Sequence, residues 1–285
     1  MIGRLTIIGV GLIGGSLALA LRQAGACREV VGCSRNAEHL QRAVELGVID
    51  RYELDPARAV EGADLVLVAV PLGAMRLVFE AMRPGLVPNT VVTDVGSAKA
   101  SVVADARAAW GELPPGFVPG HPIAGTEKSG VEAAFPTLYQ GRRVIITPLE
   151  SSSAEAVARV KAAWEVAGAV IETMSVEHHD EILAATSHLP HMLAFGLVDS
   201  LARMRDNDEI FRYAAGGFRD FTRIASSDPV MWRDICLANR GALLDMMGRY
   251  KDDLRLIEAA IEQGDGDALL EIFTRAKAAR DRFCG

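Results

Sequence analysis

A glycine-rich turn near the N-terminus restricts the possible folds of this chain more than any other stretch. Residues 5–15 read LTIIGVGLIGG, so Gly9, Gly11 and Gly14 have GxGxxG spacing between an apolar strand pattern and a helical pattern. This order predicts the first unit of a dinucleotide-binding sheet. Gly9 would allow the tight turn, Gly11 the approach of a pyrophosphate, and Gly14 close packing of the helix on the strand. The phosphates would lie at the helix N-terminus, unless the turn binds no ligand at all.

The first half of the chain continues the alternation of strands and helices. Strand patterns rich in Val and Ile cover residues 5–10, 28–34, 64–70, 90–96, 116–122 and 141–148, with helical patterns between the first four. This alternation predicts an α/β, Rossmann-type domain with a mostly parallel sheet. Strand patterns end at residues 170–175, and the rest of the chain reads as helical, including one apolar helix over 178–204 that we expect to be buried. We therefore expect a dinucleotide-binding domain over 1–175 and an all-α domain over 176–285, which by its pattern would serve for substrate binding or as a dimer interface.

Charge and cysteine content exclude several classes of protein. The 285 residues have a net charge of −7, and Lys and Arg are spread singly, so we expect no nucleic-acid partner, which would need a clustered basic face. The four cysteines form no CxxC pair, which fits a reducing compartment. The N-terminus lacks a signal-peptide pattern, and no apolar run reaches the roughly 18 residues of a membrane helix. We therefore expect a cytoplasmic protein with no membrane partner.

The end of the second strand discriminates between cofactors, because an acidic side chain there binds the ribose 2′-hydroxyl of NAD and an arginine accommodates the 2′-phosphate of NADP. This strand ends on Ser34 and Arg35 with no carboxylate, which favours NADP. Arg35 stacked on the adenine would instead tolerate NADP or NAD. The third strand ends on Val70 and Pro71, which either wall the nicotinamide pocket or merely terminate the strand. The residues expected to contact the cofactor are Gly9, Gly11, Leu12, Ile13, Gly14, Ser34, Arg35, Val70 and Pro71.

Two polar stretches follow later strands of the predicted sheet. The strand over 90–96 leads into Ser97, and the strand pattern over 116–122 leads into His121. The carboxyl ends of parallel strands meet at one edge of a sheet, so we expect Ser97 and His121 to converge above the cofactor. Histidine has the ordinary pKa best suited to taking a proton near neutral pH. His121 is therefore the candidate proton acceptor, the alternative being a strand-end histidine that is only hydrogen-bonded.

The helical half contains three candidate substrate ligands. His188 and His191 lie three residues apart, a spacing that suits a metal ion or a carboxylate. No cysteine or clear third ligand lies nearby, so we expect no metal. Arg223 follows in the stretch FRDFTRIASSDPVMW, and its guanidinium matches a planar carboxylate. The alternative is an ordinary charged surface helix, which fits Arg219 better than Arg223.

Five motifs, GVGLIGGS, DVGSAK, GHPIAGTEKSG, TSHLPH and FRDFTRIASSDPVMW, resemble in this order the prephenate and arogenate dehydrogenases of tyrosine biosynthesis. The resemblance covers residues 5 to about 250, and five ordered motifs are far more specific than the glycine turn alone. It implies NAD(P)-dependent oxidative decarboxylation of a small-molecule substrate, which is prephenate, arogenate or both. It also implies a homodimer formed through the helical half, in the single-function form without a chorismate mutase segment.

The resemblance implies a role for each motif residue. His121 would accept the proton of the substrate hydroxyl, and Ser97 would hold that hydroxyl or the imidazole in position. The residues that would bind or enclose the substrate are Arg223, His191, His188, Glu127 and Trp232. The arginine would bind a carboxylate with help from either histidine, the glutamate would gate or order the pocket, and the tryptophan would pack against its wall.

Two other interpretations keep the same fold. A reductase of the β-hydroxyacid dehydrogenase type would often use a catalytic lysine on a helix of the second half, but Lys251 and Lys277 lie in no such motif. A catalytically inactive dinucleotide-binding sensor would not require Ser97 together with His121. The sequence leaves open the choice between prephenate and arogenate, the interface residues of the dimer, and inhibition by tyrosine.

Overall fold

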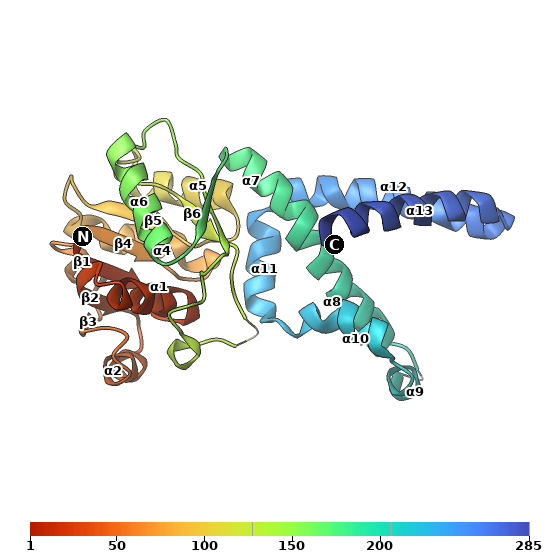
Figure 1. The fold of residues 1–285 in the computed structure, drawn as a ribbon, viewed down its shortest axis with the longest axis horizontal. Coiled ribbons are helices and arrows are strands. Elements are labelled where there is room, and N and C mark those ends of the chain that lie inside the picture. Colours follow the sequence, from red (N-terminus) through yellow and green to blue (C-terminus); the bar gives the residue numbers. More distant parts are fainter. Residues whose placement is uncertain (127, 206, 285) are drawn as a thin grey trace. The chain divides into compact units, whose positions relative to one another are not determined.

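The protein is described by a computed structural model that covers residues 1–126, 128–205 and 207–284. Its first half is built on a five-stranded parallel sheet with strand order β3-β2-β1-β4-β5 (Figure 1). The strands are β1 (Ile2–Ile8), β2 (Cys27–Cys33), β3 (Arg51–Glu53), β4 (Leu65–Val68) and β5 (Val91–Asp94). The predicted parallel sheet is confirmed. The sequence did not predict β3, whose three residues RYE carry no apolar run.

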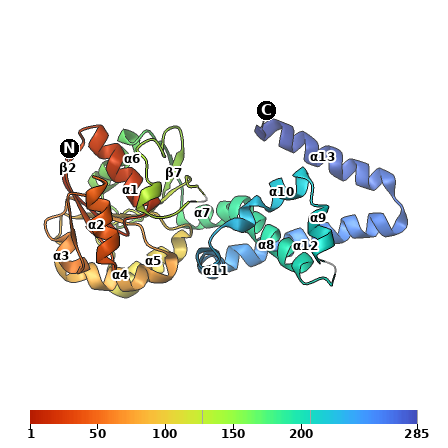
Figure 2. The same cartoon turned by 90° about the horizontal axis from the view of Figure 1, so that it is seen from below.

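Helices cover both faces of this sheet, as its apolar strands require. In β1, Leu5 and Ile7 face a core that includes Trp164, whereas Ile8 faces a second core that includes Phe79. Figure 2 shows α3, α4 and α5 along one face, with α1 and α6 on the other. The helices are α1 (Leu12–Gln23), α2 (Ala37–Glu45), α3 (Pro56–Val60), α4 (Met75–Met82), α5 (Lys99–Trp110) and α6 (Ala154–Val166).

The strand patterns over 116–122 and 141–148 do not extend the parallel sheet, which corrects the sequence prediction. They form a second, three-stranded sheet from β6 (Gly120–Pro122), β7 (Arg143–Ile146) and β8 (Val170–Thr173), with β6 antiparallel to β7. A single parallel bridge between Val92 and Phe117 connects β5 to the segment before β6. His121 pairs with Ile145 in this sheet, so its backbone is held within a strand.

The described chain is helical from residue 176 onward. The elements are α7 (Val176–Leu183), a π-helical turn (Ala184–His188), α8 (Leu189–Ala202), α9 (Asn207–Arg212), α10 (Gly216–Thr222), a 3-10 turn (Arg223–Ser226) and α11 (Pro229–Ala238). The expectation of one buried helix over 178–204 is wrong, because the π-helical turn interrupts it and only Leu189 and Ala194 of α8 are buried. Leu197 is exposed, since apolar side chains are buried only where neighbouring elements cover them.

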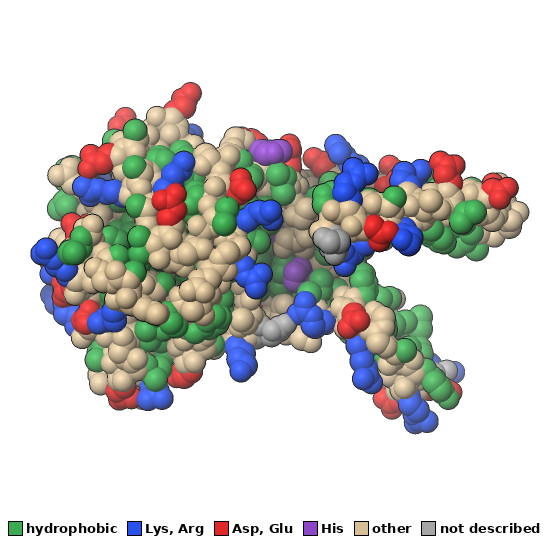
Figure 3. Space-filling model, in the orientation of Figure 1, with side chains coloured by type: hydrophobic (Ala, Val, Ile, Leu, Met, Phe, Trp, Pro, Cys, Tyr) green, Lys and Arg blue, Asp and Glu red, His purple; other side chains and the backbone are tan. Residues whose placement is uncertain are grey.

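The chain divides into two compact units, residues 1–239 and 240–285. The second unit consists of α12 (Arg240–Gln263) and α13 (Gly266–Cys284), and charges of both signs are interspersed along their surface (Figure 3). The helices α7 to α11 belong to the first unit, so the functional boundary between residues 175 and 176 stays a prediction. Within the described residues, no helix combines the length and apolar content needed to cross a membrane.

Candidate active site

The glycine-rich turn between β1 and α1 has a different steric environment at each glycine. Gly9 has a φ of +95°, and a Cβ there would lie 2.2 Å from the carbonyl oxygen of Ala69. A Cβ on Gly14 would lie 2.6 Å from the Ile7 side chain, so α1 packs too closely on β1 for any side chain at this position. Gly11 faces open space and begins α1 without a side-chain cap. Open space beside uncapped N–H groups at a helix N-terminus fits a pyrophosphate.

The other residues expected near the pyrophosphate and nicotinamide surround this turn. Leu12 is buried in the core, and the half-buried Ile13 packs partly against it. Val70 and Pro71 follow the end of β4, and a Cβ on Gly9 would lie 3.1 Å from Cγ1 of Val70. The end of β4 therefore lies directly against the glycine turn.

The segment after β2 forms a turn that leads into α2. The hydroxyl of Ser34 accepts a hydrogen bond from the backbone N–H of Asn36 at 3.3 Å, and the Asn36 side chain caps α2. Arg35 is exposed beside this turn. Nε2 of His39 lies 2.5 Å from the carbonyl oxygen of Val10, which ties α2 to the glycine turn. The sequence gave no indication of this last contact.

A fully buried ion pair holds the loop after β5. Nζ of Lys99 donates to the carboxylate of Asp94 and, at 2.5 Å, to the carbonyl oxygen of Gly120. Asp94 also accepts the backbone N–H of Gly120 at 3.1 Å. Burial lowers the pKa of Lys99, against the opposing charge of Asp94. The ion pair thus joins the loop that carries Ser97 to the residue before His121.

His121 belongs to a chain of three titratable side chains. Its Nδ1 lies 2.9 Å from Nε2 of His179, whose Nδ1 lies 2.7 Å from Oδ1 of Asp180. Asp180 also accepts the backbone N–H groups of Lys99 at 2.7 Å and Ala100 at 2.9 Å. A carboxylate only accepts, so His179 carries its proton on Nδ1 and accepts on Nε2. His121 must then donate from Nδ1, which leaves its Nε2 unprotonated.

The surroundings of these hydrogen-bonded side chains keep the imidazoles of His121 and His179 neutral. Desolvation lowers the pKa of His121 well below its usual value, and the nearby His179 and Lys99 lower it further. Desolvation also lowers the pKa of His179, although its hydrogen bond to Asp180 acts in the opposite direction. Burial alone would raise the pKa of Asp180, but hydrogen bonds from His179 and two backbone N–H groups lower it. At neutral pH the site therefore combines an ionised carboxylate with two neutral imidazoles.

The π-helical turn between α7 and α8 ends on His188, which is buried. Its Nδ1 lies 3.0 Å from Nδ2 of Asn239, and the backbone of Ser97 lies near enough to the ring to act against the lowering of its pKa. Ser97 itself is half-buried and forms no hydrogen bond with His121 within the described part of the chain. The structure thus connects Ser97 to His188.

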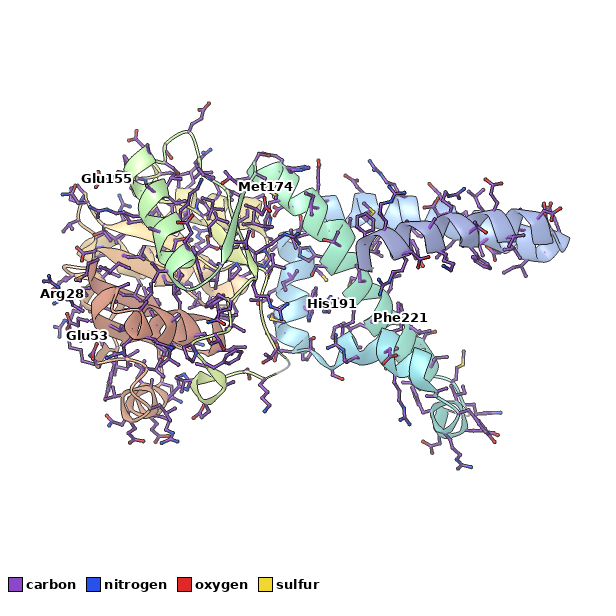
Figure 4. All side chains as sticks on the ribbon, in the orientation of Figure 1. Arg28, Glu53, Glu155, Met174, His191 and Phe221 are labelled. Atoms are coloured by element: carbon purple, nitrogen blue, oxygen red, sulfur yellow. The ribbon has the colours of Figure 1, made fainter. Side chains whose placement is uncertain are left out.

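His191 lies one turn further along the chain, on α8 (Figure 4). Its ring stacks on Trp232 of α11, with ring centroids 3.6 Å apart and the planes at 18°. Its Nδ1 donates to the carbonyl oxygen of Ser187 at 2.8 Å, which leaves Nε2 as an acceptor. Burial lowers the pKa of His191, and the charge of Arg223 lowers it further. His191, Trp232 and Arg223 are therefore close neighbours. Glu127 lies outside the described residues.

The sequence reasoning missed His179, Asp180 and Asn239. The only local signal was the run HHDE at 178–181, two histidines and two carboxylates at the start of a predicted helix. Nothing in that run indicates contact with His121, which is 58 residues away in the sequence. Asn239 carries no motif signal at all.

Family models match nearly the whole chain. The model of the nucleotide-binding domain of prephenate dehydrogenase matches residues 17–173, and the model of the dimerization domain of prephenate dehydrogenase matches residues 175–275. A cyclohexadienyl dehydrogenase of Zymomonas mobilis is 42% identical over 281 residues, which cover 97% of this chain and 94% of the relative. A prephenate dehydrogenase of Bacillus subtilis is 37% identical over 96% of this chain and 74% of its own length.

Solved structures show the same likeness. The crystal structure of prephenate dehydrogenase from Aquifex aeolicus in complex with hydroxyphenyl propionate and NAD+ superposes with a TM-score of 0.93 at 38% identity, covering 99% of both chains. The crystal structure of Synechocystis arogenate dehydrogenase gives a TM-score of 0.83 at 29% identity, covering 98% of this chain and 99% of that one.

Proposed function

The chain belongs to the prephenate dehydrogenase family, and from this we propose that it catalyses the NAD(P)-dependent oxidative decarboxylation of prephenate, arogenate or both. It is an oxidoreductase whose first domain binds a nucleotide cofactor. The products would be 4-hydroxyphenylpyruvate from prephenate and tyrosine from arogenate. Relatives named cyclohexadienyl dehydrogenase and arogenate dehydrogenase support keeping both substrates in the proposal.

The observation that carries the catalytic part of the proposal is the hydrogen-bonded chain from Asp180 through His179 to His121. It leaves Nε2 of His121 as a bare acceptor in a buried site, which is the state that a general base requires. The carboxylate of Asp180 would stabilise the positive charge that the imidazoles share when a proton arrives. A general base positioned in this way typically raises the reaction rate by about 10²- to 10⁴-fold.

The residues then act on a cyclohexadiene that carries a hydroxyl and, on the opposite ring carbon, a carboxylate. The nicotinamide ring supplies the acceptor for the hydride that leaves the hydroxyl-bearing carbon. Nε2 of His121 takes the hydroxyl proton as that carbon becomes a carbonyl. The ring carboxylate departs as CO₂, its bonding electrons remain in the ring, and the resulting phenolate recovers the proton from His121. Since aromatisation drives the reaction, the protein chiefly supplies orientation and this proton path.

Arg223, His191 and Trp232 would hold the side chain of the substrate. The guanidinium is suited to a carboxylate, and Nε2 of His191, held by the stack on Trp232, would complete the contact. Ser97 would position the hydroxyl or the catalytic imidazole, and its backbone lies near His188. The role of Glu127 as a gate remains a hypothesis.

We further propose a preference for NADP over NAD. Arg35 is exposed at the carboxyl end of β2, where a 2′-phosphate would lie, and it forms no ion pair among the described residues. The segment from Cys33 to Asn36 contains no carboxylate that would bind a ribose 2′-hydroxyl. An Arg35→Ala variant should therefore raise KM for NADP far more than KM for NAD.

We also propose a homodimer formed through the helical half of the chain. The match of residues 175–275 to a dimerization-domain model supports this assembly. The two family models meet between residues 173 and 175, which supports a functional boundary near residue 175. Light scattering of the purified protein measures the assembly directly.

Steady-state assays of cofactor reduction test the proposal, with prephenate or arogenate each paired with NAD or NADP. One strongly favoured pair would identify substrate and cofactor together, and a strong preference for NAD would contradict the argument from Arg35. His121→Asn should remove turnover and leave the fold intact, because the amide cannot take the proton. A folded protein that reduces neither cofactor with either substrate would contradict the proposed function.

A further inference from the structure

Asn239 directly follows α11 and occupies a buried position between two other elements. The residue is 4% exposed, and its Nδ2 lies 2.8 Å from the carbonyl oxygen of Asp180 and 3.0 Å from Nδ1 of His188. A carbonyl oxygen only accepts hydrogen bonds, so the amide nitrogen, and not the amide oxygen, must face Asp180. The NH₂ group has two hydrogens, and the second is available to His188.

This amide determines where His188 carries its proton. Because Nδ1 faces a donor, it must present a lone pair, and the proton of the neutral ring must be on Nε2. The ring is neutral at physiological pH, since burial lowers the pKa of His188 to about 4 against the opposing charge of Asp180. The buried Nε2 has no partner at good hydrogen-bond geometry among the described residues.

Both contacts of Asn239 lead to groups that the reaction uses. Through Asp180 it holds the residue whose carboxylate fixes the tautomer of His179. Through His188 it reaches the backbone of Ser97, which lies near enough to that ring to act on its pKa. Asn239 thus joins α11 to α7, to the π-helical turn and, through His188, to the loop after β5.

We propose that Asn239 is a positioning residue of the active site, which holds His188 as its Nε2–H tautomer against the Ser97 loop and holds Asp180 in line with His179. The roles of Ser97 and Asp180 in turnover rest on the proposed function. The tautomer of His188, in contrast, is a property of the folded chain and is measurable without substrate.

Two variants and one control test this proposal. Asn239→Asp keeps the shape of the side chain but replaces the donor with an acceptor, and Asn239→Leu removes both hydrogen bonds while keeping the branch at Cγ. Asn89→Asp is the matched control, because Asn89 is exposed in a turn before β5. The tautomer is read from ¹⁵N NMR of the ring nitrogens in histidine-labelled full-length enzyme, with the His188 signals identified by their loss in His188→Gln.

In the unmodified enzyme we expect a protonated Nε2 and an unprotonated Nδ1 on His188. In Asn239→Asp we expect Nδ1 to become protonated, because it then faces an oxygen acceptor. The kcat of both variants should fall about 10- to 100-fold, with substrate KM changed less than about threefold, since a misplaced group mainly affects the transition state. Asn89→Asp should match the unmodified enzyme in both measurements.

A proton on Nδ1 of His188 in the unmodified enzyme would overturn the tautomer assignment. A folded Asn239→Asp enzyme that shows the moved proton but turns over within about threefold of normal would overturn the positioning role. If Asn239→Leu does not fold, Asn239→Asp decides both questions. An unmodified enzyme without activity on either substrate would reject the proposed function, while the NMR result would still decide the tautomer.

Discussion

Replacing Asp180 with asparagine tests the hydrogen-bonded chain that ends on His121. The change preserves size and shape but converts one carboxylate oxygen into an NH₂ donor. Oδ1 receives Nδ1 of His179 at 2.7 Å and the backbone N–H of Lys99 at 2.7 Å, and Oδ2 receives the backbone N–H of Ala100 at 2.9 Å. Donors surround both oxygens, so neither orientation of the amide can satisfy the site.

Each orientation has a definite consequence. If the NH₂ group faces His179, that ring must carry its proton on Nε2 and donate to Nδ1 of His121, which moves the proton of His121 onto the reacting Nε2. A wrong histidine tautomer of this kind costs about 10⁴-fold in the serine protease triad. If the NH₂ group faces Ala100, the tautomers survive, but α5 loses a cap worth about 1 kcal/mol and the imidazoles lose their counter-charge.

We therefore expect Asp180→Asn to lower kcat about 10²- to 10⁴-fold, or about 3 to 5 kcal/mol in activation free energy. Steady-state kinetics with the preferred substrate and cofactor measure this loss, and circular dichroism checks the fold. Asp199→Asn is the matched control, because Asp199 is an exposed residue of α8 that pairs only with Arg203 among the described residues. A folded Asp180→Asn enzyme with kcat within about threefold of normal would refute the reasoning.

Two variants of His179 separate the effect of its hydrogen bond to His121 from the effect of its packing. His179→Gln can still accept the Nδ1 proton of His121 through its amide oxygen, whereas His179→Leu cannot accept at all. We expect the glutamine variant to retain clearly more activity than the leucine variant. Equal activity of the two would mean that the hydrogen bond between His121 and His179 does not matter for turnover.

Three further predictions concern cofactor binding and stability. Gly11→Ala should weaken NAD(P) binding at least about tenfold but leave the melting temperature unchanged, because its Cβ enters open space. Gly14→Ala should weaken binding and also lower the free energy of unfolding by about 1 to 3 kcal/mol, because its Cβ overpacks the core. Calorimetric titration and melting curves measure both quantities, and identical behaviour of the two variants would contradict the prediction. Lys99→Met should cost about 3 to 5 kcal/mol in urea unfolding because it leaves Asp94 buried without its cation, and a loss below about 1 kcal/mol would argue against the ion pair. Because the pKa of His188 falls from 6.5 to about 4 on folding, the unfolded chain binds more protons than the folded chain between these two pH values. The free energy of unfolding should therefore keep its full contribution from His188 above about pH 6.5 and decrease by about 3 kcal/mol as the pH falls towards 4. Unfolding measured over this pH range without such a decrease would contradict the assignment.

The sequence predicted the first half of the fold because its signals are local. The strand, glycine turn and helix over residues 5–25 follow one another directly, and the spacing of the three glycines marks the turn within a few residues of chain. Parallel strands that are buried on both faces read as apolar runs, which made β1, β2, β4 and β5 recognisable. β3 and the separate sheet of β6, β7 and β8 were not predicted, since an apolar run does not specify its partner or its direction.

The candidate site was predictable only where a motif marked it. His121 and Ser97 stood out because each lies at or just after the end of a strand pattern, in a glycine-containing stretch. Their partners did not, since the contact of His121 with His179 spans 58 residues and that of Lys99 with Asp180 spans 81. Asn239 escaped notice because its importance lies entirely in two contacts with distant helices.

The sequence by itself determined the family, the dinucleotide-binding architecture and the identity of the candidate base, because these depend on residue types at short spacing. Only the tertiary structure decided which nitrogen of each histidine carries a proton and that the imidazoles are neutral. Protonation depends on desolvation and on partners within hydrogen-bond distance, and both arise only when segments far apart in the sequence pack together.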